Sequence, residues 1–226
     1  MKVVILAAGM GKRLSQKIPK ALVKIFKNKT ILDFQLERIL KKIPAENIII
    51  VVGYKKNEII SNYNKFNFVE NQQYEITNTS KSLLEGLKDL DDDVIWMNGD
   101  IYFEEGILDL LLKNDLSCCL VTNKKCGEEE VKFNLNEGEI CEISKKVKEP
   151  MGEALGINKI LKNDLRFIKE ELAKVENEDY FEKAVENIIK KNKVKFYPVD
   201  IKNLFCVEID YESDLQLVKD HIKSEK

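Results

Sequence analysis

The sequence predicts an α/β domain with a parallel sheet at its core and a mixed second half. Short, continuous apolar runs alternate with amphipathic segments through residues 1–122, as strands and helices alternate in a parallel α/β sheet. Beyond residue 130 the pattern changes to a hairpin and one long apolar run. Antiparallel pairs are therefore expected to extend the parallel core.

Strands and helices alternate regularly in the first half. Lys2–Ala8 is a continuous apolar run rich in β-branched residues, which favours a strand buried on both faces. Asn28–Thr30 then offers a turn and a helix N-cap ahead of apolar residues at helical spacing. The expected strands are Lys2–Ala8, Asn47–Gly53, Phe66–Val69, Val94–Asn98 and Ser117–Thr122, and the expected helices are Ile31–Lys42, Lys55–Tyr63, Thr79–Leu90 and Glu104–Lys113.

The second half begins with a hairpin, in which Asn136-Glu137-Gly138 joins Val131–Leu135 to Glu139–Ile143. Repeats, low-complexity segments and linkers are not evident, so we expect a single domain over 1–226. The further expected strands are Gly152–Ile160, Val194–Pro198 and Cys206–Ile209, and the helices are Leu165–Val175, Asp179–Lys191 and Asp214–Ile222.

The composition is that of a soluble globular protein, with 226 residues of which 44% are hydrophobic and 34% charged. The formal net charge of -2 attracts neither nucleic acid nor an anionic membrane. Five cysteines without a C-x-x-C pair, together with a single histidine, argue against a zinc site. The sequence shows neither a signal peptide nor an apolar run approaching the ~18 residues of a membrane span. We expect a cytoplasmic protein with reduced thiols.

The loop after the first strand has the chemistry of a phosphate site. Leu6–Arg13 reads LAAGMGKR, and Pro19-Lys20 follows. Small residues let backbone N–H groups approach phosphate oxygens closely, and Arg13 and Lys20 add two cations. The position at the carboxyl end of a strand is where α/β sheets bind ligands.

Two better-known phosphate motifs do not match this loop. A Walker loop needs G-x-x-x-x-G-K-[ST], which the chain does not contain. A dinucleotide fingerprint needs a third glycine where Leu14 stands. The remaining structural alternative is an ordinary glycine turn flanked by surface cations.

Asp100 and Asp210 are candidate metal ligands. Asp100 follows Asn98-Gly99 at the end of an apolar strand, and Asp210 ends the run Glu208-Ile209-Asp210 before the last expected helix. Carboxylate oxygens suit Mg²⁺, which keeps waters and phosphates as its other ligands. Each aspartate also has a structural alternative, a turn residue at Asp100 and a helix N-cap at Asp210.

These motifs together resemble a known family. The Leu6–Arg13 loop with Pro19-Lys20 is similar to the signature of the nucleotidyltransferases that make nucleotide sugars and CDP-alcohols, and Asp100 and Asp210 resemble the two metal-binding aspartate positions of that family. The resemblance covers nearly the whole chain. It implies a Rossmann-like, GT-A-like three-layer α/β/α sandwich around a mostly parallel mixed sheet. About 1–122 would form the nucleotide-binding half and about 123–226 the acceptor-binding half.

Within this family the chain is most similar to the compact cytidylyltransferases that act on phosphocholine and aminoalkylphosphonates. The segments that carry this similarity are Asn78–Leu83, Glu142–Lys145, Gly152–Ile157 and Tyr180–Glu182. One departure concerns Gly127–Glu130, which stands near the place where an aromatic residue for a quaternary ammonium is expected. An acidic pocket there would suit an amine or amino acid instead. Phe181 has core packing as its structural alternative.

The resemblance implies Mg²⁺-dependent transfer of CMP from CTP to a small phosphorylated acceptor, with release of pyrophosphate. The acceptor could be phosphocholine, phosphoethanolamine, an aminoalkylphosphonate or a phosphorylated amino acid such as phosphoglutamine. A sugar-1-phosphate or inositol-phosphate nucleotidyltransferase is one alternative, and a non-catalytic nucleotide-binding regulatory module is another. Nucleic acid and membrane insertion are not expected, and the sequence does not indicate an oligomeric state.

The residue roles follow from the same resemblance. Arg13 would neutralise the leaving pyrophosphate, and Lys20 would bridge the α-phosphate and the acceptor phosphate. Asp100 and Asp210 would hold the metal. Nucleotide contacts are expected from Leu6, Ala7, Ala8, Gly9, Met10, Gly11, Asn78, Thr79, Ser82, Asn98 and Gly99, and acceptor contacts from Lys145, Glu153, Tyr180 and Glu182.

Overall fold

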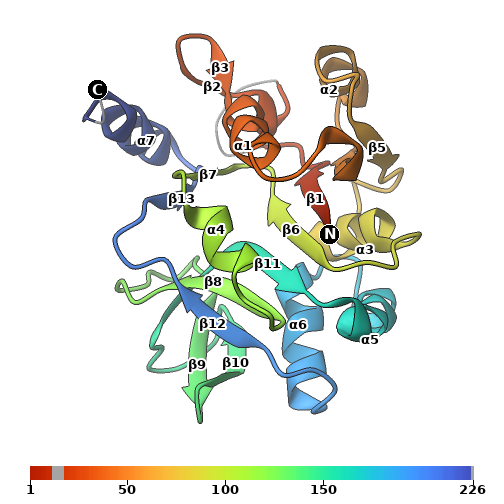
Figure 1. The fold of residues 1–226 in the computed structure, drawn as a ribbon, viewed down its shortest axis with the longest axis vertical. Coiled ribbons are helices and arrows are strands. Elements are labelled where there is room, and N and C mark those ends of the chain that lie inside the picture. The colour runs from red at the N-terminus through yellow and green to blue at the C-terminus, as the bar shows by residue number, and fades with distance from the viewer. Residues whose placement is uncertain (12–17, 225–226) are drawn as a thin grey trace.

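The computed structural model describes residues 1–11 and 18–224, which form a nine-stranded mixed sheet between two layers of helices (Figure 1). The strands follow one another across the sheet in the order β10-β9-β11-β6-β1-β4-β5, and β8 and β12 join through β11. The strand bounds are β1 Lys2–Ala7, β4 Ile48–Val52, β5 Asn67–Glu70, β6 Val94–Asn98, β8 Cys118–Thr122, β9 Lys132–Asn136, β10 Glu139–Ser144, β11 Gly152–Ile160 and β12 Tyr197–Asp200.

The parallel core is built on β1, which pairs with β4 on one side and β6 on the other. Alternate β1 side chains point to opposite faces, so Val3 and Ile5 enter one apolar cluster and Val4 and Leu6 the other. The first cluster includes α1 (Ile31–Leu40), α2 (Lys56–Asn62) and α4 (Ile107–Leu112), and the second includes α3 (Thr79–Leu87), α5 (Lys162–Lys174) and α6 (Phe181–Lys190). The predicted three-layer sandwich is therefore confirmed.

The mixed character comes from β11, which pairs antiparallel with β6, β8 and β9. β12 then pairs parallel with β8. In Figure 1 strands β8, β9, β10 and β12 gather at the lower end of the molecule, away from β1 and β5. The second half of the chain thus extends the sheet that the first half begins. No helix among the described residues is long and apolar enough to cross a bilayer.

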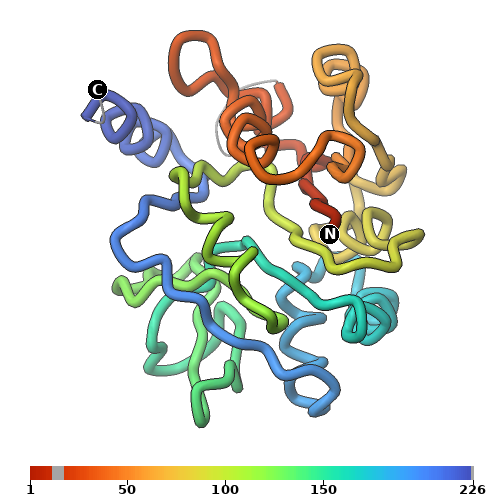
Figure 2. The backbone as a smooth tube through the Cα atoms, viewed as in Figure 1, coloured from red at the N-terminus to blue at the C-terminus, as the bar shows by residue number. Residues whose placement is uncertain are grey.

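Two short ribbons lie outside the main sheet. β2 (Lys24–Phe26) pairs with β3 (Lys29–Thr30), and β7 (Ile101–Phe103) pairs antiparallel with β13 (Cys206–Glu208). The last helix, α7 (Glu212–Ser224), packs through Leu215 and Val218 against the apolar residues around β2. Figure 2 shows the blue C-terminal end beside the red and orange N-terminal third. Single 3-10 turns occur at η2 (Lys20–Leu22) and η3 (Ala45–Asn47).

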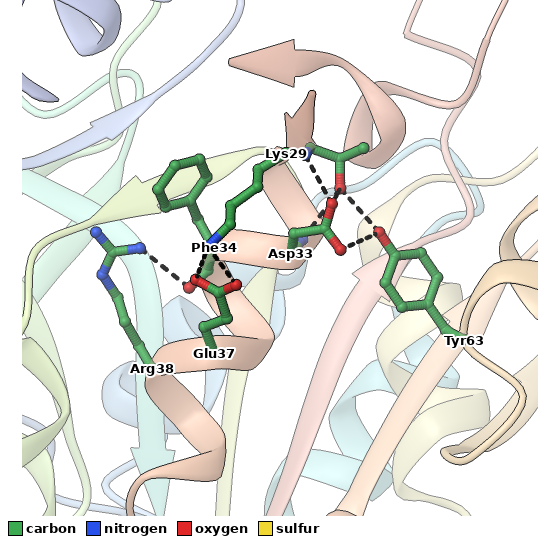
Figure 3. A network of polar contacts seen from close by, with 7 residues as sticks. Lys29, Asp33, Phe34, Glu37, Arg38 and Tyr63 are labelled. Atoms are coloured by element: carbon green, nitrogen blue, oxygen red, sulfur yellow. Dashed lines mark hydrogen bonds and ion pairs between the residues drawn. The ribbon is translucent and has the colours of Figure 1, made fainter. Parts of the chain in front are cut away.

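The N-cap predicted around Asn28–Thr30 is confirmed at the start of α1 (Figure 3). Thr30 and Asp33 form a reciprocal capping box, with Asp33 N donating to Thr30 Oγ1 at 3.0 Å and Thr30 N donating to Asp33 Oδ2 at 2.8 Å. The Tyr63 hydroxyl donates to Asp33 Oδ1 at 2.9 Å and so ties the end of α2 to this cap. Farther along α1, Lys29 contacts Glu37 and Arg38 donates to the Phe34 carbonyl.

Two expected elements begin three residues later than the sequence suggests. The helix expected over Glu104–Lys113 begins at Ile107, because Gly106 adopts a φ of 98° and the Glu104 carboxylate accepts a hydrogen bond from Phe205 N at 2.7 Å. The strand expected over Val194–Pro198 occupies Tyr197–Asp200 instead. Its bounds follow from pairing with β8, where Tyr197 lies opposite Cys118. Contacts with distant parts of the chain therefore determine where both elements begin.

Phe181 belongs to the core of the α3, α5 and α6 face. Its side chain is fully buried and meets Trp96 edge-on, with ring centroids 5.8 Å apart. Phe181→Ala should therefore lower the free energy of unfolding by about 3–5 kcal/mol, measured by urea denaturation. Tyr180→Ala is the matched control, since Tyr180 is 43% exposed, and its effect should stay within about 0.5 kcal/mol. Equal effects of the two substitutions would contradict this placement of Phe181.

Candidate active site

The loop after β1 opens at the carboxyl edge of the parallel sheet. Ala7 and Ala8 are buried beneath it, and the Ala8 carbonyl accepts a hydrogen bond from Tyr54 N at 3.1 Å. Gly11 has a φ of 59°, and a Cβ there would come within 3.1 Å of the Lys20 side chain. Glycine at this position thus permits both the left-handed backbone and the close approach of Lys20.

The turn after β6 lies directly beside this loop. Gly99 N donates to the Leu6 carbonyl at 2.9 Å, and a Cβ on Gly99 would lie only 2.6 Å from that oxygen. Gln35 is buried in α1, and its Nε2 donates to the Asn98 and Ile101 carbonyls at 2.9 and 2.8 Å. Helix α1 therefore fixes the backbone on both sides of Asp100.

Lys20 joins the two aspartates. Its ammonium donates to Asp100 Oδ2 at 2.7 Å and also to Asp210 Oδ1. Burial alone would lower the pKa of Lys20, but the charges and hydrogen bonds of Asp100 and Asp210 outweigh it and raise the pKa above its ordinary value. Lys20 is consequently a fixed cation at every physiological pH.

Asp210 is directed toward this cation, while another residue caps α7. The Asp214 carboxylate accepts hydrogen bonds from Asp210 N at 2.9 Å and from Tyr211 N at 2.7 Å. This is the arrangement of an acidic residue in the first turn of a helix. The Asp210 side chain therefore contacts Lys20 instead of serving as the N-cap that was its structural alternative.

A third carboxylate, that of Glu208, completes the cluster. Oxygen atoms of Asp100, Glu208 and Asp210 lie within 4.8 Å of one another. Asp100 Oδ1 is buried and has no hydrogen-bond partner among the described residues. The protein that surrounds the cleft and the charges of Asp100 and Asp210 raise the pKa of Glu208 above its usual range, although the residue is exposed to the cleft. Converging carboxylates with an unsatisfied oxygen fit a hard divalent cation.

These groups line one cleft of about 700 Å³ that runs between the two halves of the chain. The second half of the chain contributes Glu153 on β11, Lys145 after β10, and Tyr180 and Glu182 at the start of α6 to its lining. The predicted site residues that line it are Leu6, Ala7, Ala8, Gly9, Met10, Gly11, Lys20, Asn78, Thr79, Ser82, Asn98, Gly99, Asp100, Lys145, Glu153, Tyr180, Glu182 and Asp210.

Known proteins share the N-terminal part of this chain, including the loop after β1 and the turn that carries Asp100. The family model for the MobA-like NTP transferase domain matches residues 3–155, more than half of the chain. The chain belongs to the MobA-like NTP transferase family. The match includes the loop after β1, Lys20 and Asp100, and it ends before Tyr180, Glu182 and Asp210.

Individual members and neighbours of this NTP transferase family cover more of the chain. CTP:phosphoglutamine cytidylyltransferase of Campylobacter jejuni is 29% identical over 258 residues, covering 96% of this chain and 98% of that protein. The bifunctional protein GlmU of Methanocaldococcus jannaschii is 30% identical over 203 residues, covering 86% of this chain. The chain spans about half (48%) of that relative's length.

Among solved structures, CTP:phosphocholine cytidylyltransferase of Streptococcus pneumoniae superposes with a TM-score of 0.83 at 22% identity. The superposition covers 98% of each chain. At this identity the likeness shows the fold, which is that of the nucleotidyltransferases, and it agrees with the resemblance noted from the sequence.

Several expected nucleotide-binding residues of this NTP transferase also hold the backbone together. Asn78 caps α3, with its side chain accepting from Thr79 N at 2.8 Å and donating to the Glu178 carbonyl at 3.2 Å. Thr79 Oγ1 accepts from Phe181 N at 3.1 Å. The Ser82 hydroxyl accepts from the buried Asn71 amide at 3.0 Å. Asn78 and Thr79 thereby connect the two halves of the chain at one wall of the cleft.

Two points separate the sequence expectation from the observed site. Arg13 lies outside the described residues, so its role stays a prediction. Glu208 and Gln35 were not expected to contribute. A signal for Glu208 was present, because Cys206, Glu208 and Asp210 alternate along an extended segment and so share a face. No such signal existed for Gln35, because its role depends on how α1 packs against the turn that carries Asp100.

Proposed function

We propose that this NTP transferase moves CMP from CTP to a small phosphorylated acceptor and releases pyrophosphate. The observation that carries the proposal is Lys20, held between Asp100 and Asp210 at the edge of the loop after β1. That arrangement supplies a fixed cation and acidic ligands beside a backbone suited to phosphates. Relatives that act with CTP support the choice of nucleotide.

The proposed step is an in-line displacement at the α-phosphorus of CTP. An oxygen of the acceptor phosphate forms the new P–O bond, the bond to the β-phosphate breaks, and the electron pair leaves with pyrophosphate. Because a phosphate dianion is the nucleophile, the charges balance without removal of a proton. The reaction then depends on positioning and charge neutralisation, which is consistent with a site built from a lysine and carboxylates.

Each group on the cleft wall has a place in this proposal. The loop from Ala8 to Gly11 would cradle the triphosphate, and Lys20 would contact the α-phosphate and the incoming acceptor phosphate. Asp100, Glu208 and Asp210 would hold Mg²⁺, which when bound neutralises charge on the phosphate oxygens. Arg13 is predicted from the sequence to stabilise the departing pyrophosphate.

Nucleotide choice is tested by thermal unfolding with CTP, UTP and dTTP in the presence of Mg²⁺. A ligand at a hundred times its Kd stabilises by about 2.7 kcal/mol, which corresponds to roughly 5–10 °C for a chain of this size. We expect that shift with CTP and a smaller one with the other two. A larger shift with UTP or dTTP would favour the sugar-1-phosphate alternative.

Transfer itself is tested by pyrophosphate release from CTP with a panel of phosphorylated acceptors. The panel contains phosphocholine, phosphoethanolamine, aminoethylphosphonate, phosphoglutamine, inositol 1-phosphate and glucose 1-phosphate. Release that requires one of these acceptors supports the proposal. Stabilisation by CTP without release for any acceptor would instead support the non-catalytic nucleotide-binding module.

A further inference from the structure

Three carboxyl groups from the second half of the chain line the cleft. Glu130 precedes β9, Glu153 lies on β11, and Glu182 lies in the first turn of α6. Among the described residues, none of the three carboxylates has an ion pair or a hydrogen bond to another side chain, and the Glu182 carboxylate accepts only from its own backbone N–H. Glu182 is only 8% exposed although it lines the cleft, and Glu130 Oε2 is buried without a hydrogen-bond partner. Unpaired carboxyl groups in such surroundings call for a counterion or a proton.

The electrostatics show how unfavourable their charged forms are without a ligand. Burial raises the pKa of Glu153 to about 7; the charge of Glu130 adds to the rise, and Lys124 opposes it. Burial also raises the pKa of Glu182 to about 7, against the opposing effects of its own backbone N–H and Lys145. A bound cation would favour both charged forms.

The nearby lysine does not supply that cation, because it is already engaged. Lys145 Nζ lies 3.3 Å from Glu129 Oε2 and 5.0 Å from the centroid of the Tyr180 ring. The same contact occupies the face of the aromatic ring on this side of the cleft. A quaternary ammonium depends on open aromatic faces and would make few favourable contacts here. An ammonium with N–H donors can instead hydrogen-bond to the carboxylates.

These carboxyl groups also line the same cleft as Lys20 and Glu208. The charge of Glu182 contributes to the raised pKa of Glu208, and the charge of Glu153 contributes to that of Cys206, which begins the strand carrying Glu208. A compact molecule could thus place a phosphate at Lys20 and a cationic end among these glutamates.

We propose that the acceptor carries an ammonium group with N–H donors, and that Glu153 and Glu182, assisted by Glu130, form its binding site. This inference rests on the proposed function, because it assigns the acceptor end of the same cleft. It names the substrate class as amino-substituted phosphate or phosphonate esters, and it sets them apart from both neutral and quaternary analogues.

The test compares 2-aminoethyl phosphate with 2-hydroxyethyl phosphate and phosphocholine. Pyrophosphate release gives kcat/KM with CTP, and calorimetry gives Kd for each acceptor. We expect the amine to be preferred over the hydroxyl analogue by at least tenfold. Glu153→Gln and Glu182→Gln should each lower kcat/KM for the amine at least tenfold and raise its Kd at least tenfold, with a much smaller effect on the hydroxyl analogue. Glu128→Gln is the control, since Glu128 is exposed on the same loop and does not line the cleft.

The pH dependence of the KM for the amine distinguishes direct binding by Glu153 from a purely structural role. With a pKa of about 7, Glu153 is mostly neutral at pH 6 and mostly charged at pH 8, so the KM for the amine should fall roughly tenfold across that range. The groups facing Glu153 are Glu130, Lys124, Cys126 and Cys206. The pH dependence of the KM for the hydroxyl analogue reports the titration of the acceptor phosphate alone. Glu153→Gln should remove the additional pH dependence that is seen with the amine.

Failure of this inference and failure of the proposed function look different. Equal use or equal binding of the amine and hydroxyl acceptors by the unmodified protein would overturn the ammonium site, as would a preference that survives in both glutamine variants. Selective binding of the amine that both variants abolish, without pyrophosphate release from any acceptor, would uphold the ammonium site and overturn the transfer reaction.

Discussion

Replacing Lys20 with alanine is expected to lower kcat/KM for pyrophosphate release by roughly two to three orders of magnitude. The substitution removes a cation that the protein holds in place beside Asp100 and Asp210. Losing one preorganised charge-stabilising group typically costs about 3–4 kcal/mol of transition-state stabilisation. The rate is measured with saturating CTP and Mg²⁺ and the best acceptor of the panel.

A control and a second measurement distinguish lost chemistry from lost structure. Lys24→Ala removes an exposed lysine from the same segment and should keep the full rate. Lys20→Ala also leaves Asp100, Glu208 and Asp210 without their neighbouring cation, so its melting temperature should depend more strongly on Mg²⁺ than that of the unmodified protein. A Lys20→Ala variant with an unchanged rate would show that this lysine has no part in the transfer.

Asp100→Asn should lower kcat/KM by about two orders of magnitude or more and raise the Mg²⁺ concentration needed for half-maximal rate. Asparagine keeps the size of the side chain but removes the negative charge that a hard cation prefers. Fold stability should be largely preserved without Mg²⁺, because Lys20 keeps its contact with Asp210 and the repulsion between Asp100 and Glu208 disappears. The measurement is a Mg²⁺ titration of pyrophosphate release.

Asp89→Asn provides the matched control, since Asp89 is exposed and does not line the cleft. It should show the Mg²⁺ dependence of the unmodified protein. Asp210→Asn should behave like Asp100→Asn if both belong to one cation site. Full activity of both variants at limiting Mg²⁺ would refute the assignment of a metal to these carboxylates.

The order of elements and the nucleotide side of the cleft were predictable because local signals are strong there. A few adjacent residues are enough to predict the apolar run of β1, the capping residue Thr30 and the turn at Asn98–Asp100. The short strands β2, β3 and β7 were not expected. Strands of two or three residues carry too little periodicity, and β7 exists because β13 pairs with it.

The acceptor side was harder for a related reason. Glu130, Glu153 and Glu182 are far apart in the sequence, and only the antiparallel pairing of β11 and the placement of α6 bring them to one cleft. Charged residues in a chain with 34% charged content are unremarkable one by one. Their burial distinguishes them from ordinary surface glutamates, and burial is a property of the assembled fold.

The contact between Lys20 and Asp210 joins residues 190 positions apart, and Asp210 follows β13, which belongs to a small ribbon separate from the main sheet. During synthesis the phosphate loop and the Asp100 turn emerge long before that ribbon can form. A nascent chain, or one cut before β13, would have the loop after β1 and Asp100 but would lack Glu208 and Asp210. Under the proposed function, the set of carboxylates for the cation is therefore complete only after β13 has paired with β7.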